Sequence, residues 1–175
     1  MVRALVVYES VFGDAEAIAR AIAAGLAGHV AVDVVAAREA PTDVGADVAL
    51  LVVGGPTHAF GLSRPSTRDS AGQQGAPADL ARAPGLREWL AELPHTTCRV
   101  AAFDTRIHQR GVPGSAARVA ERRLGKAGGR VVSPAMSFWV SGMHGPLAAG
   151  ETERARSWGR LLATRLPDRL SDLAG

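Results

Sequence analysis

Short apolar runs alternate along the chain with longer polar or amphipathic segments. Most of these runs are rich in Val and contain no alternating polar positions, which is typical of strands buried on both faces of a sheet. The pattern predicts five strands, at residues 4–8, 30–36, 48–53, 100–103 and 131–140.

The segments between the runs carry apolar residues at helical spacing. Ile18, Ile22 and Leu26, for example, fall on one face of a helix. Helices are predicted at residues 15–27, 85–93, 115–126 and 151–166. Strands that alternate with helices imply right-handed crossovers, a parallel sheet and helices on both of its faces. We therefore expect a three-layer α/β fold with a single domain over residues 1–175.

Residues 64–84 break this alternation. The segment contains several Pro and Gly residues and no sustained apolar period. Long irregular segments in compact domains are usually functional or disordered, so it is interpreted as a long excursion and not as a linker between domains.

Three loops follow the first, third and fourth predicted strands, at residues 9–14, 54–61 and 104–108. In an open parallel sheet, ligands bind at the carboxyl ends of the strands, so these loops are expected to converge. The first loop leads from a strand directly into a helix, and the unpaired N–H groups of a helix start attract phosphate. A phosphorylated ligand is therefore the first candidate.

In these segments the chain resembles the flavodoxin-like family, and in particular a bacterial branch of it. The resemblance rests on the strand–turn–helix start, on residues 54–57 and on residues 103–106, and it spans nearly the whole chain. It implies a sheet order of 2-1-3-4-5 and non-covalently bound FMN, with the first loop at the phosphate and the other two beside the isoalloxazine ring. The cofactor-binding residues that it implies are Ser10, Val11, Phe12, Gly13, Asp14, Ala15, Pro56, Thr57, His58, Phe60, Gly61, Asp104, Thr105, Arg106 and His108.

The first loop departs from the family pattern, which is rich in hydroxyl groups. Phe12 and Ala15 replace hydroxyl residues, and Asp14 stands where Asn is common. A carboxylate about 4 Å from a phosphate charge costs about 4 kcal/mol at an effective dielectric constant near 20. Two interpretations keep Asp14 compatible with the fold. It caps the following helix while Ser10 and backbone N–H groups hold the phosphate, or it caps the helix with no ligand present.

Several other residues near the expected ring site have two interpretations. Phe60 either borders the flavin or anchors its loop on the core. Arg106 either places positive charge beside the flavin or forms an ion pair with Asp104. Ile107 is expected at the border of the ring.

His144 lies in the loop after the last strand. It is either a solvent or substrate contact or a surface residue without a role. Trp89, Trp139 and Trp158 are expected to pack in the interior.

The residues leave three functions open. The first is an FMN protein that takes part in electron transfer with an unidentified redox partner, with no catalytic residue of its own. The second is a binding domain that kept the fold and lost the flavin, which Asp14 and Ala15 favour. The third is an FMN-dependent NAD(P)H reductase, although the chain carries no nicotinamide-binding fingerprint.

The distribution of charge along the chain bears on which partners it could bind. The net charge is +3, and residues 99–130 hold eight basic side chains against two acidic ones. The basic side chains in residues 118–126 fall at helical spacing and no nucleic-acid motif is present, so a solvated helix face is expected and not a nucleic-acid site. Because flavodoxins are usually acidic, a redox partner of this chain is expected to differ from theirs.

The remaining chemistry is limited. Cys98 cannot form an intramolecular disulfide, lies in an apolar run and is interpreted as a core thiol in a reduced compartment, with a redox or nucleophilic role as the alternative. The five His residues show no paired spacing, so no metal site is expected. No segment is long and apolar enough to cross a membrane, and a cytoplasmic location is expected.

Overall fold

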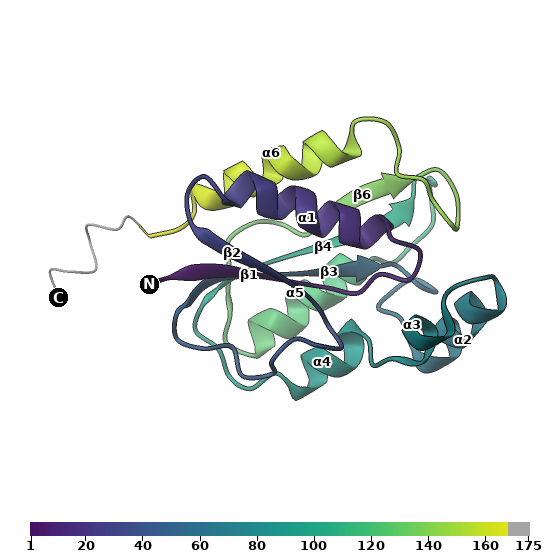
Figure 1. Ribbon diagram of the computed structural model, residues 1–175, viewed down its shortest axis with the longest axis horizontal. Helices are drawn as coiled ribbons and strands as arrows, with labels where there is room; N and C mark the ends of the chain where they lie inside the picture. The colour runs from purple at the N-terminus through teal and green to yellow at the C-terminus, as the bar shows by residue number, and fades with distance from the viewer. Residues whose placement is uncertain (168–175) are drawn as a thin grey trace, which may run out of the picture.

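Helices cover both faces of a central sheet in the computed structural model, which describes residues 1–167 (Figure 1). The helices α1 (Asp14–Leu26) and α6 (Glu151–Ala163) lie side by side on one face. The helices α4 (Leu86–Glu92) and α5 (Ala116–Lys126) lie on the opposite face. This arrangement confirms the predicted three-layer α/β fold. The domain predicted over residues 1–175 also includes residues 168–175, which lie outside the described residues.

All strand pairs in the described sheet are parallel, and the order along the sheet is β2-β1-β3-β4-β5, with β6 also paired to β4. This confirms the predicted 2-1-3-4-5 order. The strands are β1 (Arg3–Tyr8), β2 (Ala31–Ala36), β3 (Val48–Pro56), β4 (Arg99–Ile107), β5 (Arg130–Val131) and β6 (Met136–Val140).

The last predicted strand, residues 131–140, is divided into β5 and β6. Both parts pair with β4, from Val100 opposite Val131 to Ile107 opposite Val140. Pro134 lies in the interruption, and it has no N–H group to donate to the sheet. The prediction of one continuous strand was therefore wrong, although the whole segment follows β4.

The apolar core forms two layers, one on each face of the sheet. Ile18, Ile22 and Trp158 pack between the sheet and the α1–α6 pair. Leu86 and Trp89 belong to the second layer, between the sheet and the helices α4 and α5. The central strands are buried on both faces as predicted, whereas β2 lies at the sheet edge and its pattern alternates between exposed and half-buried residues.

Residues 64–84 contain two further helices, α2 (Pro65–Gln73) and α3 (Ala78–Arg82), beyond the carboxyl ends of the strands (Figure 1). The excursion was predicted without secondary structure. The side chain of Arg68 on α2 is almost fully buried and forms an ion pair with Glu88 on α4 at 2.8 Å. A contact between residues twenty positions apart supplies the stability that local apolar spacing lacks.

Two smaller expectations are also resolved. Cys98 is a free thiol that is half-buried and packs against the core, so it is less buried than predicted. Within residues 1–167, no helix has the length and apolar character needed to cross a membrane.

Candidate functional site

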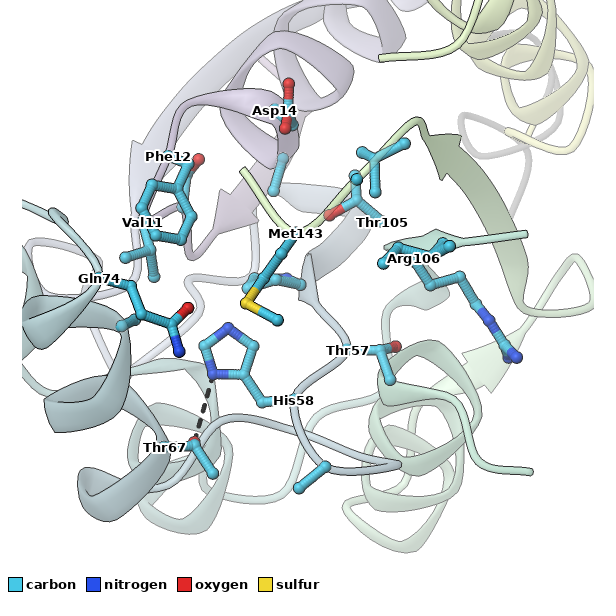
Figure 2. A pocket seen from close by; sticks show the side chains of 18 of the residues that line it. Val11, Phe12, Asp14, Thr57, His58, Thr67, Gln74, Thr105, Arg106 and Met143 are labelled. Carbon is cyan, nitrogen blue, oxygen red and sulfur yellow. Dashed lines mark hydrogen bonds between the residues drawn. The ribbon is translucent and has the colours of Figure 1, made fainter. Parts of the chain in front are cut away.

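A cavity of about 330 Å³ opens at the carboxyl ends of β1, β3 and β4 (Figure 2). The loops after these strands form part of its wall, as the convergence argument predicted. The rest of the wall comes from α2 and from residues 140–143, which follow the last strand. Five chain segments therefore enclose one site.

The first loop turns sharply at Gly13, where φ is +99°, a value that suits Gly. Gly13 is the N-cap of α1, and its N–H group donates to Ser10 Oγ at 3.1 Å. The N-cap position provides no side-chain hydrogen bond to the helix. The prediction that Asp14 caps α1 is therefore wrong. Asp14 is the first helical residue, and the first N–H groups of α1 lack intrahelical acceptors.

The Asp14 side chain lines the cavity and approaches the loop after β6 (Figure 2). Its carboxylate lies so close to Gly145 that a Cβ atom there would overlap it. Partial burial raises the pKa of the Asp14 carboxyl group. None of the hydrogen bonds or ion pairs among residues 1–167 pairs this carboxylate with another side chain.

The second loop places His58 in the cavity, with its Nδ1 atom 3.2 Å from Thr67 Oγ1 on α2 (Figure 2). With Thr67 Oγ1 donating to the Arg64 carbonyl oxygen at 3.0 Å, the Nδ1–H tautomer of His58 is the one that donates to Thr67. The Nε2 atom of a neutral His58 is then an acceptor. Burial lowers the pKa of His58, and the opposing attraction of Glu9 is the smaller effect.

Ala59 and Phe60 form the tip of this loop, and both have positive φ angles, 43° and 71°. His58 and Gly61 bond to each other across the tip, at 2.8 Å and 3.0 Å, which makes a tight two-residue turn. Phe60 is 59% exposed and does not line the cavity. The alternative that Phe60 anchors the loop on the core is therefore wrong.

The third loop contributes Thr105, Arg106 and Ile107 to the cavity wall. The guanidinium group of Arg106 points away from the cavity, where it donates to the carbonyl oxygens of Gly114 at 2.6 Å and Val112 at 3.1 Å (Figure 2). Arg106 thus braces the segment that leads into α5. The alternative of an ion pair with Asp104 is wrong.

Asp104 is fully buried beneath the cavity and does not line it. Its Oδ2 atom accepts hydrogen bonds from Thr57 Oγ at 2.9 Å, from Ser115 Oγ at 2.5 Å and from the Ala117 N–H group at 3.1 Å. The carboxylate therefore ties the second loop and the start of α5 to β4. The Asp104 side chain thus has a structural role, and its predicted contact with a cofactor stays a prediction.

Flavodoxins are among the solved structures that resemble this architecture. Flavodoxin 2 from Bacillus cereus superposes with a TM-score of 0.70 at 17% identity, over 94% of this chain and 100% of that chain. A flavodoxin from the domain Archaea gives 0.66 at 20% identity, over 94% and 98%. A flavodoxin, WrbA-like protein from Agrobacterium tumefaciens gives 0.58 at 18% identity, over 94% and 97%.

The chain has a flavodoxin-like fold. No protein-family model matches the chain. No curated protein matches it either. At these identities, the similarity to solved structures establishes the architecture and leaves the ligand to the residues of the site.

Ten of the fifteen predicted binding residues of this flavodoxin-like chain line the cavity: Ser10, Val11, Phe12, Asp14, Ala15, Pro56, Thr57, His58, Thr105 and Arg106. The other five, Gly13, Phe60, Gly61, Asp104 and His108, lie outside its wall. Gly13 shapes the first turn, and His108 packs on Trp139 with ring centroids 4.4 Å apart. Of the three Trp residues, Trp89 and Trp158 are buried as predicted, and Trp139 is half-buried near the end of β6.

Eight further residues line the cavity and were not predicted as binding residues: Ala59, Thr67, Ser70, Ala71, Gln74, Val140, Gly142 and Met143. Four of them belong to α2 or follow it directly, in the segment without an apolar period. Met143 comes from the loop whose His144 was a candidate contact, and its side chain hangs over the centre of the cavity (Figure 2). His144 itself stacks on Phe12, with centroids 4.5 Å apart.

A partly buried polar network holds α2 in place behind the cavity. Glu9, at the end of β1, accepts hydrogen bonds from Ser63 Oγ and from the Leu86 N–H group, the latter at 2.8 Å. Arg68 joins this network by donating to Ser63 Oγ at 2.9 Å and to Glu88. Because these contacts join β1, α2 and α4, the cavity wall is fixed to the sheet. Residues 1–167 contain no group of three or more His, Cys, Asp or Glu residues suited to a metal ion.

Proposed function

We propose that this protein binds a flavin non-covalently in the cavity and takes part in electron transfer, with FMN as the flavin that the resemblance to flavodoxins implies. The observation that carries the proposal is the position of the cavity at the carboxyl ends of β1 and β3, where the strand order reverses. Ligands of open α/β sheets bind at this switch point. The cavity volume of about 330 Å³ also suits a small molecule.

The wall fits a planar aromatic ring system. Val11, Ala71 and Val140 offer apolar surface, and Met143 provides a polarisable thioether over the opening. His58 Nε2 offers one hydrogen-bond acceptor to a ring N–H group. A bound flavin supplies the redox chemistry, while these residues orient the ring and exclude water from one of its faces.

The phosphate end fits less well, and this favours a second candidate function. The N–H groups at the start of α1 are available to an anion, but Phe12 and Ala15 offer no hydroxyl group and Asp14 adds negative charge. These three residues suit a flavodoxin-like binding domain that works without flavin.

Titration of the purified protein with FMN, followed by quenching of flavin fluorescence and by the visible spectrum, tests the proposal. We expect a micromolar or lower Kd. Ser70→Trp fills the cavity from α2 and should abolish quenching, whereas Asp69→Trp, one position along on the exposed side, should not. Failure of the wild-type protein to quench FMN at millimolar concentration would favour the flavin-free domain.

Electron transfer requires a second measurement on the complex. Reversible bleaching and recovery of the bound flavin's visible absorption during reduction and reoxidation would support it. The net charge of +3 favours an acidic redox partner. A complex that binds flavin but releases it on reduction would argue against a stable electron carrier.

A further inference from the structure

The charges that face the cavity are unbalanced. Among the described lining residues, the ionisable side chains are those of Asp14, His58 and Arg106. The Arg106 guanidinium group is held by two backbone carbonyl oxygens and turned away. Burial lowers the pKa of His58, which is therefore neutral at pH 7. Among the described lining residues, Asp14 therefore supplies the charged side chain that faces the cavity at neutral pH.

The side chains of the first loop do not compensate for this charge. Ser10 offers one neutral O–H donor, since its Oγ uses a lone pair to accept the Gly13 N–H group, and Val11, Phe12 and Ala15 have no side-chain donor. The helix dipole of α1 favours an anion near its first turn. However, Asp14 already places a negative charge there, at the position where a ligand phosphate would approach the free N–H groups.

The ring end of the cavity has no such conflict. Its wall is apolar or uncharged around Met143 and His58, and its neutral polar side chains, such as His58 and Gln74, suit the neutral N–H and carbonyl groups of a ring. Ring binding and phosphate binding are therefore separable in this chain, because different residues determine each.

We infer that the cavity recognises the flavin ring and gains little from the phosphate, so that an uncharged flavin such as riboflavin binds about as tightly as FMN, with Asp14 as the specificity-determining residue. This inference rests on the proposed flavin binding. It assigns to the site a class of ligand, the neutral flavins, and to Asp14 the role of rejecting the doubly charged phosphate.

Parallel titrations with FMN and riboflavin, at one pH and one ionic strength, test the inference. In the wild-type protein the Kd values for FMN and riboflavin should agree within about threefold. Asp14→Asn removes the charge and keeps the size of the side chain. It should tighten FMN by roughly ten- to a thousandfold, according to how strongly solvent screens the charges, and leave riboflavin nearly unchanged.

Asp69→Asn is the matched control, because it makes the same change of net charge on the exposed side of α2. It should leave both affinities as in the wild type. A His144→Ala variant tests whether the imidazole stacked on Phe12 contributes to phosphate binding. Circular dichroism and thermal unfolding confirm that each variant is folded before its affinities are compared.

Two outcomes would overturn the inference while flavin binding stands. One is FMN binding more than about thirtyfold tighter than riboflavin in the wild-type protein, which is about 2 kcal/mol of phosphate recognition. The other is an Asp14→Asn variant that shifts both affinities equally. If neither flavin binds to the wild type or to any variant, the proposed function fails and the inference fails with it.

Discussion

At the scale of single residues, the clearest change of role concerns Asp104. It follows a buried strand in a loop that resembles a flavin-binding loop, and its position alone suggests a ligand contact. The structure instead buries it and directs Oδ2 at Thr57, Ser115 and the start of α5. Its carboxylate shapes the cavity by holding the second loop and α5 in place.

Replacement of Asp104 by Ala should destabilise the fold strongly. The change leaves two hydroxyl groups and the Ala117 N–H group without their acceptor, which costs about 3 kcal/mol or more. Ser115→Ala removes one cap and should cost about 1 kcal/mol. Urea denaturation measures both values. Asp69→Ala, on an exposed position, is the control and should stay within about 0.5 kcal/mol of the wild type.

His58 should make the stability depend on pH. Burial lowers its pKa in the folded protein below the unfolded value of about 6.5. The unfolded chain therefore binds the proton more tightly, so stability is complete above pH 6.5 and falls as the pH drops towards the folded pKa.

Thermal unfolding of the wild type and of His58→Asn between pH 8 and pH 5 checks this expectation. Asn keeps an N–H donor near the Nδ1 position that contacts Thr67. The variant should lose less stability on acidification than the wild type does, with pH 8 as the reference where the imidazole is neutral. Parallel curves for the two proteins would show that His58 does not carry the effect.

At the scale of elements, two contacts fix the helices around the site. The network of Glu9, Ser63, Arg68 and Glu88 fixes α2, which forms one wall of the cavity. On the other face, α1 and α6 approach closely at Gly25 and Gly159, where added Cβ atoms would overlap backbone oxygens of Arg156 and Ile22. This close approach sets the position of α1, whose first turn carries Asp14.

Gly25→Ala and Gly159→Ala should each destabilise the protein by about 1–3 kcal/mol, because the methyl group forces the two helices apart. In an exposed helix position the same substitution normally stabilises by about 1 kcal/mol. Gly125→Ala on α5 is the matched control, since its Cβ atom meets no atom closer than Val131 Cγ2 at 4.0 Å. Urea denaturation should therefore give opposite signs for the two helix-contact variants and the control.

At the scale of the whole molecule, the fold gathers five segments around one cavity at the carboxyl ends of the strands. A ligand that contacts all five segments binds the folded chain and not the unfolded one. Ligand binding and global stability are therefore linked in this protein.

A bound flavin should raise the unfolding temperature. At a free concentration of one hundred times Kd, the stabilisation is about 2.7 kcal/mol, which corresponds to roughly 5–10 °C for a chain of this size. Differential scanning calorimetry with and without flavin measures the shift. Ser70→Trp, which fills the cavity, should unfold at the same temperature in both conditions. A shift that persists in this variant would place the ligand elsewhere.

The sequence by itself determined the layers and the edge of the sheet where the site lies. Val-rich runs and helical spacing are local signals, because burial on two faces or on one face dictates them directly. They located the four core helices and the strands of the 2-1-3-4-5 sheet, apart from the interruption at Pro134. The three loops that they placed together contribute ten of the predicted binding residues to the cavity wall.

The tertiary structure alone decided which side chains face the cavity. Arg68 stabilises α2 through Glu88, which lies twenty positions away, so no local sequence pattern predicts that helix. Arg106 turns outward because carbonyl oxygens six and eight residues later accept its N–H groups. Asp14 faces the site and does not cap α1, because Gly13, with its left-handed backbone, takes the N-cap position. Each of these outcomes depends on contacts that exist only once the chain has folded.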